Sequence, residues 1–193
     1  QTIFQLGLGQ FVQSAEAADN GEKCVIYSGD SDLRQLVNEH VWVACPGKGK
    51  DELFDIDGVT IRYGLPPSQI PELKALAGDS SDKIPGAPGI GAVTATKLLR
   101  HYGTLKAVVE AARREDKSWP ETPRRRAIIA AAGDDVMKYL QLTTIRTDLA
   151  WVAVNHVAHP QQADVLAHLQ LLKFRSMALP SELAALMRLG RRL

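Results

Sequence analysis

This sequence of 193 residues has few cysteines and no long apolar run. Its two cysteines, Cys24 and Cys45, form no CxxC pair, which excludes a disulfide framework and a zinc ribbon; both are expected to be buried thiols. No apolar run reaches the roughly 18 residues that a transmembrane helix requires. The opening residues, QTIFQLGLGQFVQ, lack the basic start and the cleavage site of a signal peptide. We therefore expect a folded cytoplasmic protein without a membrane span.

Net charge is also almost absent, at +1, but the charges are unevenly distributed. Residues 15–82 contain 13 acidic and 6 basic side chains, a balance of −7, whereas residues 83–126 contain 10 basic and 4 acidic side chains, a balance of +6. This pattern fits a cation site beside a surface for a phosphate backbone. A solvated charged face is the alternative for either half.

The sequence changes character at residues 78–99, GDSSDKIPGAPGIGAVTATKLL. Proline lacks an amide donor and glycine favours turns, so these residues predict a tight loop: Pro85, Gly86, Pro88, Gly89 and Gly91. A helix is expected to begin near Ala92. Its predicted apolar face comprises Val93, Ala95, Leu98 and Leu99, with Thr94, Lys97 and Arg100 on the more polar side.

A Gly-x-Gly loop that leads into a helix exposes backbone N–H groups at the positive end of the helix dipole, where phosphate binds. Lys97 and Arg100 would add positive charge one and two turns further on. The alternative is a loop that only connects two helices, because GxGxxT is a weak motif by itself. A dinucleotide-binding fold fits less well, since its glycines should follow an apolar strand rather than the polar segment DSSDK.

Two aspartates follow a short apolar segment, residues 23–28, that is predicted to be a buried strand. Asp30 and Asp32 would lie at its carboxyl end, where open α/β sheets bind ligands. In an extended chain both side chains would point the same way. The alternative is that Asp30 or Ser31 is the N-cap of a helix over residues 33–37.

A second pair of aspartates stands at the start of the central loop. Asp79 and Asp82 are three residues apart, so they would share one face of a helical turn. Carboxylates held close together repel one another and favour a bound cation, typically a hard divalent ion with oxygen ligands. Mg²⁺ or Mn²⁺ is therefore the expected ion.

The remaining segments predict a mixture of strands and helices. Strands are expected at 40–45 and, partly extended with a turn at Asp57-Gly58, at 54–61; a short helix could begin within 59–63. Helices are expected before residue 20 and over 70–77, 105–112, 127–132, 134–142 and 163–172, with a strand-like segment at 151–157. Arg124 to Arg126 open one of these helices, an unfavourable position that needs an anionic neighbour such as phosphate, unless the charges are simply solvated.

Five segments, in order, resemble the 5′ nuclease family of flap endonucleases, phage 5′ exonucleases and the 5′ nuclease domain of bacterial DNA polymerase I. They are SGDSDLRQLV, YGLPP, the central motif, YLQLTTIRTDL and LLKFRSM, and the resemblance covers roughly residues 21–175. The resemblance implies an α/β fold with a PIN-like parallel-sheet core and a helix-three-turn-helix lobe. Residues 1–65 would belong to the core, 66–175 to the helical lobe and 176–193 to a basic tail.

The resemblance also implies a function: structure-specific, two-metal hydrolysis of DNA near a 5′ end, flap or nick by a monomer, nucleoid-associated in a bacterium or in the host cytoplasm for a phage. It assigns the metal and catalytic roles to Asp30, Asp32, Asp79 and Asp82, with Mg²⁺ or Mn²⁺ as cofactor. It assigns DNA binding to Lys83, Gly89, Gly91, Thr94, Lys97 and Arg100, with K⁺ at the Gly89–Gly91 loop. Lys83 departs from the asparagine that is more usual in bacterial relatives.

The sequence departs from the family at its amino-terminal end. The family has an aspartate-bearing first strand, a basic arch and a Glu-x-Asp-Asp segment, whose expected position near Gln5 to Leu8 contains no carboxylate. Two hypotheses follow. The chain is a 5′ nuclease without the family's amino-terminal part, or it is a non-catalytic module that binds DNA structures; an RNase of the broader PIN class is a distant third.

Overall fold

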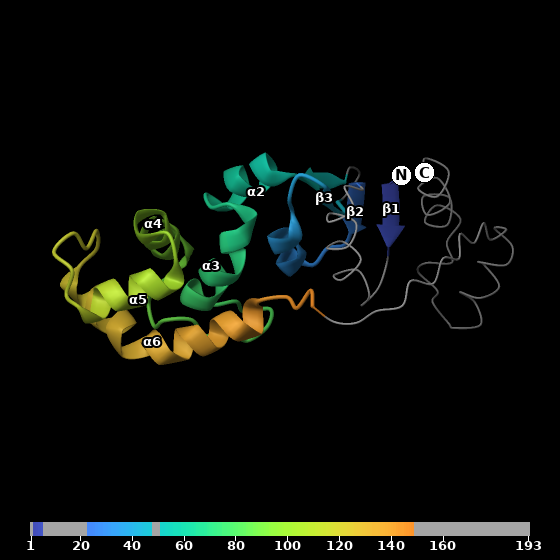
Figure 1. Ribbon diagram of the computed structural model, residues 1–193. Helices are drawn as coiled ribbons and strands as arrows, with labels where there is room; N and C mark the ends of the chain where they lie inside the picture. The colour runs from blue at the N-terminus through green and yellow to red at the C-terminus, as the bar shows by residue number, and fades with distance from the viewer. Residues whose placement is uncertain (1, 6–22, 48–50, 149–193) are drawn as a thin grey trace, which may run out of the picture. The chain divides into compact units, whose positions relative to one another are not determined.

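The computed structural model describes residues 2–5, 23–47 and 51–148 (Figure 1). The elements expected before residue 20 and after residue 150 lie outside these residues. In chain order the elements are β1 (Thr2–Gln5), β2 (Lys23–Tyr27), the 3₁₀ helix η1 (Ser31–Leu36), β3 (Val41–Cys45), β4 (Glu52–Phe54), α2 (Ile56–Tyr63), η2 (Pro67–Gln69), α3 (Ile70–Ala77), α4 (Ala92–Tyr102), α5 (Leu105–Arg113) and α6 (Pro123–Thr143). None of the described helices is long and apolar enough to cross a membrane.

The four strands form one mixed sheet in the order β1-β2-β3-β4. Strands β2 and β3 are parallel, from Cys24 opposite Val41 to Tyr27 opposite Ala44, which confirms the two strands predicted there. The expected parallel-sheet core is thus a mixed sheet, because β4 runs antiparallel to β3. A short connection from β3 allows only this direction, since a parallel return needs a longer crossover.

The segment after β4 is the helix α2, which confirms the short helix considered at 59–63 but begins earlier, at Ile56, where a partly extended chain with a turn at Asp57-Gly58 was expected. Asp55 is the N-cap of α2, and its carboxylate accepts a hydrogen bond from the Gly58 amide at 2.7 Å. Gly64, with φ of 71°, ends the helix in the left-handed conformation that glycine readily adopts. The aspartate and the glycine therefore mark the two ends of α2.

Helix α4 begins at Ala92, as predicted, but its buried face is rotated from the predicted one. Val93 is 87% exposed, whereas Thr94 is buried beside Ala95, Leu98 and Leu99. Helix α6 is one helix of 21 residues where two were expected. Gly133 does not interrupt it because α5 packs closely there: a Cβ atom on Gly133 would lie 2.6 Å from Val109 Cγ1.

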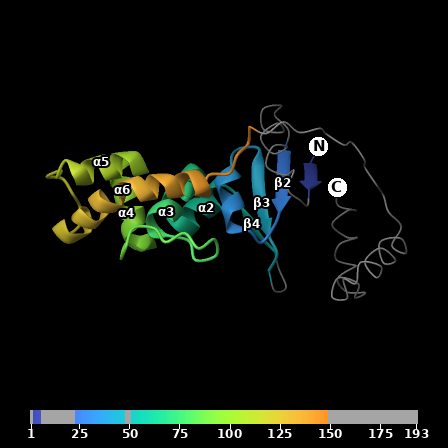
Figure 2. The ribbon, with the colours of Figure 1, turned by 90° about the horizontal axis from the view of Figure 1, so that it is seen from below.

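Two hydrophobic clusters stabilise the described residues. One joins the sheet to η1 and α2 through residues such as Ile26, Val43 and Phe54. The other fills the space between α3, α4, α5 and α6, and Figures 1 and 2 both show α3 and α5 alongside α6. Of the two thiols, Cys24 is buried as expected, and burial raises its pKa, whereas Cys45 is only half-buried.

The chain crosses itself tightly on either side of residues 79–84. Asp79 and Ile84 exchange two backbone hydrogen bonds of 2.8 Å, which close the turn between them. Just outside it, Gly78 and Gly86 meet with positive φ angles of 86° and 65°. A Cβ atom on Gly86 would lie 2.3 Å from the Gly78 nitrogen, so only glycine fits there.

We expect Gly86→Ala to destabilise the protein by about 3 kcal/mol or more, because it combines left-handed strain with a backbone clash. Gly89→Ala is the matched control: Gly89 has φ of 72°, but its Cβ would meet no atom within 4 Å. The control should lose only about 1 kcal/mol from strain. Urea unfolding measures both changes, and equal losses would show that the crossing is not tight.

Candidate metal and nucleic-acid site

Asp30 and Asp32 lie just beyond the carboxyl end of β2, but not on an extended chain. Asp30 is the N-cap of η1, and its carboxylate accepts a hydrogen bond from the Asp32 amide at 2.9 Å. Asp32 lies inside η1, so the two side chains do not share one face of an extended strand; the alternative, that Asp30 is the N-cap of a helix here, is confirmed. The strand ends at Tyr27 because the chain then turns into the capped helix. Asp30 is exposed.

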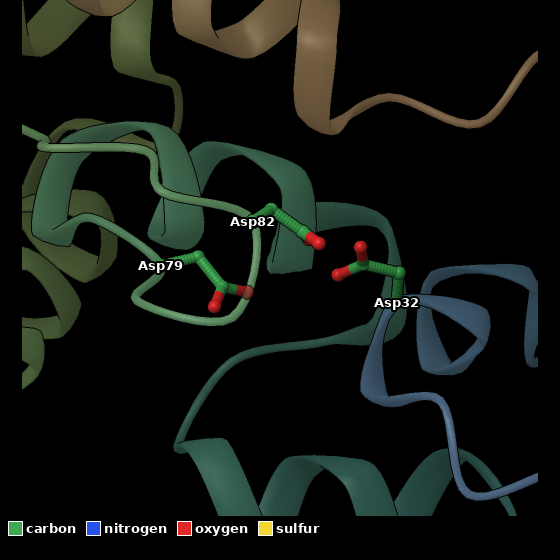
Figure 3. A group of neighbouring side chains, drawn as sticks. All are labelled: Asp32, Asp79 and Asp82. Carbon is green, nitrogen blue, oxygen red and sulfur yellow. The ribbon is translucent and has the colours of Figure 1, made fainter.

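Asp79 and Asp82 lie in the turn that follows α3 rather than on a helical turn. Asp79 Oδ1 accepts hydrogen bonds from the amide and the hydroxyl of Ser81, which fixes its orientation. Figure 3 shows the Asp82 carboxylate directed toward Asp32, which comes from η1. One ligand oxygen from each of Asp32, Asp79 and Asp82 lies within 4.8 Å of the others. We call these three residues the carboxylate cluster.

Lys74 neutralises part of the carboxylate cluster. Its Nζ atom forms ion pairs with Asp32 and, at 2.7 Å, with Asp79, and donates a hydrogen bond to Ser31 Oγ at 2.8 Å. The residue is buried in α3. Sequence reasoning missed Lys74, although a signal exists: it is four residues after Ile70 and therefore on the apolar face of its helix, where an unpaired lysine would be unfavourable.

This arrangement changes the ionisation of Asp79. Burial alone raises the pKa of its carboxyl, but hydrogen bonds from Lys74 and Ser81, together with the Lys74 charge, outweigh burial and lower the pKa to about 2. Asp79 is therefore ionised at neutral pH. An ionised carboxylate is the form that coordinates a metal ion.

Gln35 holds η1 in place against the end of α6. Its side-chain amide donates hydrogen bonds of 3.0 Å to the Thr143 and Asp32 carbonyl oxygens, and its oxygen accepts one of 2.9 Å from the Ile145 amide. Thr143 in turn donates from its hydroxyl to the Pro71 carbonyl oxygen at 3.0 Å. The backbone of Asp32 is thus tied to α6, and α6 is tied to α3.

The glycine loop of residues 85–91 presents an open surface at the start of α4. A Cβ atom on Gly89 or Gly91 would meet nothing within 4 Å, so another molecule can approach the backbone closely. The first amides of α4 have no intrahelical acceptor. Lys83 is exposed and has φ of 58°, a conformation in which asparagine is more common than lysine.

The other predicted DNA-binding residues lie in different surroundings. Lys97 donates hydrogen bonds to the Pro120 carbonyl oxygen at 2.7 Å and to Glu121 at 2.8 Å, yet its side chain remains 54% exposed. Arg100 Nε donates to the Gly64 carbonyl oxygen at 2.6 Å and so ties α4 to the end of α2. Thr94 is buried.

The donor set of the carboxylate cluster suits a hard divalent cation. Three carboxylate groups from two chain segments converge, and all their donors are oxygens. Hard divalent ions such as Mg²⁺ and Mn²⁺ prefer this chemistry, whereas zinc sites usually include nitrogen or sulfur ligands. Asp30 does not belong to the group of three, although it is two residues from Asp32.

Several proteins of known function have related sequences. The chain is 46% identical over 98 residues to DNA polymerase I of Bacillus caldotenax, covering 50% of this chain and 11% of that protein. It is 39% identical over 139 residues to DNA polymerase I of Chloroflexus aurantiacus, covering 69% of this chain and 14% of that protein. It is 35% identical over 126 residues to a 5′-3′ exonuclease of Halalkalibacterium halodurans, covering 65% of this chain and 41% of that protein. The chain thus spans less than half the length of each of these relatives.

Solved structures show the same fold at lower sequence identity. The 5′-exonuclease of bacteriophage T5 with bound zinc ions gives a TM-score of 0.58 at 18% identity, covering 69% of this chain and 48% of that one. The bacteriophage T5 flap endonuclease in complex with DNA and metal ions gives a TM-score of 0.57 at 17% identity, covering 70% of this chain and 48% of that one.

Residues 65–165, more than half of the chain, match the family described as 5′-3′ exonuclease, C-terminal SAM fold. This range includes α3, the carboxylates of Asp79 and Asp82, the glycine loop and α6. The chain belongs to the 5′-3′ exonuclease family.

Proposed function

We propose that this chain forms part of a structure-specific 5′ nuclease, a 5′-3′ exonuclease or flap endonuclease, that hydrolyses DNA phosphodiesters with divalent metal ions. The observation that carries the proposal is the carboxylate cluster, in which η1 and the turn after α3 bring three ligand oxygens within 4.8 Å. The glycine loop follows the same turn by only a few residues. Two of the three proposed metal ligands, Asp79 and Asp82, therefore belong to the same continuous segment as the proposed phosphate-binding surface.

Asp32, Asp79 and Asp82 are the proposed metal ligands, with Mg²⁺ or Mn²⁺ as the ion. Asp30 would complete the set by reaching the same ion or a second one from the N-cap of η1. When bound, a pair of divalent ions supplies an activated water and stabilises the charges that develop on the attacking and leaving oxygens. Lys74 and Ser81 hold Asp79 ionised and oriented, and Gln35 fixes the backbone of Asp32.

The proposed DNA-binding element is a helix-three-turn-helix formed by α3, the glycine loop and α4. Amides at Gly89, Gly91 and the start of α4 would bind duplex phosphates, and loop carbonyl groups could also hold K⁺. Lys83, Lys97 and Arg100 would add positive charge. Thr94 lies in the first turn of α4 and is buried, so it would contribute by packing rather than by direct contact with DNA. Because these contacts involve the backbone of the duplex, recognition should depend on DNA structure rather than on sequence.

A DNA-structure-binding module without hydrolytic activity is the second candidate. The ion pairs of Lys74 favour it, because one ammonium group already neutralises part of the charge that would attract metal ions. The exposed position of Asp30, outside the group of three, also favours it. The two candidates differ in one measurable property, which is turnover of a DNA substrate in the presence of Mg²⁺.

The natural protein, as its gene encodes it, should cleave a 5′-flap duplex in Mg²⁺ and lose activity when Mg²⁺ is chelated. Asp79→Asn should lower the cleavage rate by at least about 100-fold, because it removes an ionised metal ligand without changing side-chain size. Single-turnover assays on a labelled flap measure the rate. Asp135→Asn is the control, since Asp135 lies on the exposed surface of α6.

Equal rates for Asp79→Asn and the wild type would overturn the assignment of the metal site. Salt-dependent binding to flap DNA without cleavage in Mg²⁺ or Mn²⁺ would instead support the non-catalytic module.

Lys74→Met should lower stability in metal-free buffer by about 2 kcal/mol, because it leaves the half-buried carboxylates of Asp32 and Asp79 without their cation. Millimolar Mg²⁺ should then raise the melting temperature of this variant more than that of the wild type, since the ion takes over the missing charge. Thermal unfolding with and without Mg²⁺ measures both effects. Lys138→Met removes an exposed ion pair and should change neither value appreciably; identical Mg²⁺ shifts in all three proteins would contradict the expected competition.

A further inference from the structure

Three consecutive arginines at the start of α6 have no role in the proposed function. Arg124, Arg125 and Arg126 occupy the first turn of this helix, which contains no acidic residue. The first turn carries the positive end of the helix dipole, so positive side chains there are unfavourable unless anions neutralise them. An arginine in this turn that has no carboxylate partner therefore marks a place where an external anion could bind.

Two of the three arginines have carboxylate partners within the chain. Arg125 Nη1 lies 2.6 Å from Glu121 Oε2, and Arg126 Nη2 lies 3.5 Å from Glu115 Oε2. Arg124 is exposed and forms no hydrogen bond or ion pair within the part of the chain that the structure describes. One full positive charge thus remains without an internal anion at the start of α6.

The same surface contains a cavity of about 570 Å³. Its lining combines the beginning of α6 with the glycine loop: Pro88, Gly89, Thr122, Arg124, Arg125 and Ile128. Both arginines of the lining belong to the triplet, and Arg124 is the one without a partner. Among the described residues, no acidic side chain lines the cavity. The cavity is therefore a positively charged depression beside the backbone of Gly89.

We propose that this cavity is a second phosphate site, which extends the DNA interface from the glycine loop onto the start of α6. The ligand is a backbone phosphate of the same duplex that the loop holds, with the Arg124 guanidinium as its principal partner and Arg125 as a secondary one. A guanidinium group matches the geometry of phosphate oxygens. The half-buried Ile128 offers an apolar surface for the adjoining sugar. This inference rests on the proposed binding of DNA by the loop.

A DNA backbone suits the site better than an isolated small anion. The cavity shares Gly89 with the loop, and a Cβ atom on that glycine would meet nothing within 4 Å, so a continuous polyanion can pass from one to the other. Successive phosphates in one strand also neutralise charges on both elements at once. Each phosphate contact made by a cation releases bound counterions, which gives the site a measurable signature in salt dependence.

The test compares Arg124→Gln with Arg114→Gln in the natural protein, by measuring affinity for a labelled 5′-flap duplex over a range of salt concentrations in Ca²⁺. Arg114 is also an exposed arginine but does not line the cavity. Arg124→Gln should weaken binding about five-fold at 100 mM salt and reduce the slope of log K against log salt by about 1. Arg114→Gln should leave the slope unchanged, and Arg124→Lys should retain most of it.

The outcomes separate this inference from the proposed function. Equal slopes for the wild type and Arg124→Gln would overturn the second phosphate site while leaving the nuclease proposal intact. A reduced slope in a protein that does not cleave the flap in Mg²⁺ would support the site and overturn the hydrolytic function. A wild-type protein that does not bind the duplex would overturn both.

Discussion

Mutual repulsion among three carboxylates is the constraint around which the described residues are arranged. Asp32, Asp79 and Asp82 approach within 4.8 Å, a separation at which like charges oppose folding unless a cation lies among them. Lys74 supplies that cation from the buried face of α3 and joins η1 to the turn after α3. The Gln35 contacts and the buried hydroxyl of Thr143 fix the same elements from the side of α6. The carboxylate cluster can therefore persist without a bound cation, because the internal ammonium group of Lys74 partly neutralises it.

The segment between α3 and α4 connects this cluster to a surface of opposite character. Gly78 and Gly86 cross at backbone contact, which closes the turn that carries Asp79 and Asp82 and directs the following residues into the glycine loop. A change at the crossing would consequently disturb carboxylates and loop together. The uneven charge of the sequence changes sign within this turn, since acidic residues predominate up to Asp82 and basic residues from Lys83 onward.

Local patterns in the sequence predicted the elements that depend on neighbouring residues. The strands β2 and β3, the apolar helix α3 and the start of α4 all follow from periodicity and from Pro/Gly signals. Features that depend on distant residues were missed. Lys74 acquires its role only when η1 folds beside α3, and Gly133, which lies within α6, is explained by the close approach of α5. Thr94 is buried, and Val93 exposed, because packing against neighbouring helices, rather than polarity alone, sets the orientation of α4.

The basic surface after the crossing is not uniform, and its internal ion pairs explain why. Glu121 lies between Lys97 and Arg125, and hydrogen bonds from these two residues lower its pKa, so it remains ionised at neutral pH. A DNA phosphate that binds Lys97 or Arg125 must compete with this carboxylate, and the net gain is the difference between two similar interactions. Arg124 has no such carboxylate partner among the described residues, so a phosphate there would not compete with one. The number of basic residues therefore does not by itself predict how strongly each part of this surface attracts phosphate. Arg124, which has no partner among the described residues, should attract a phosphate more strongly than Lys97, which is paired with Glu121.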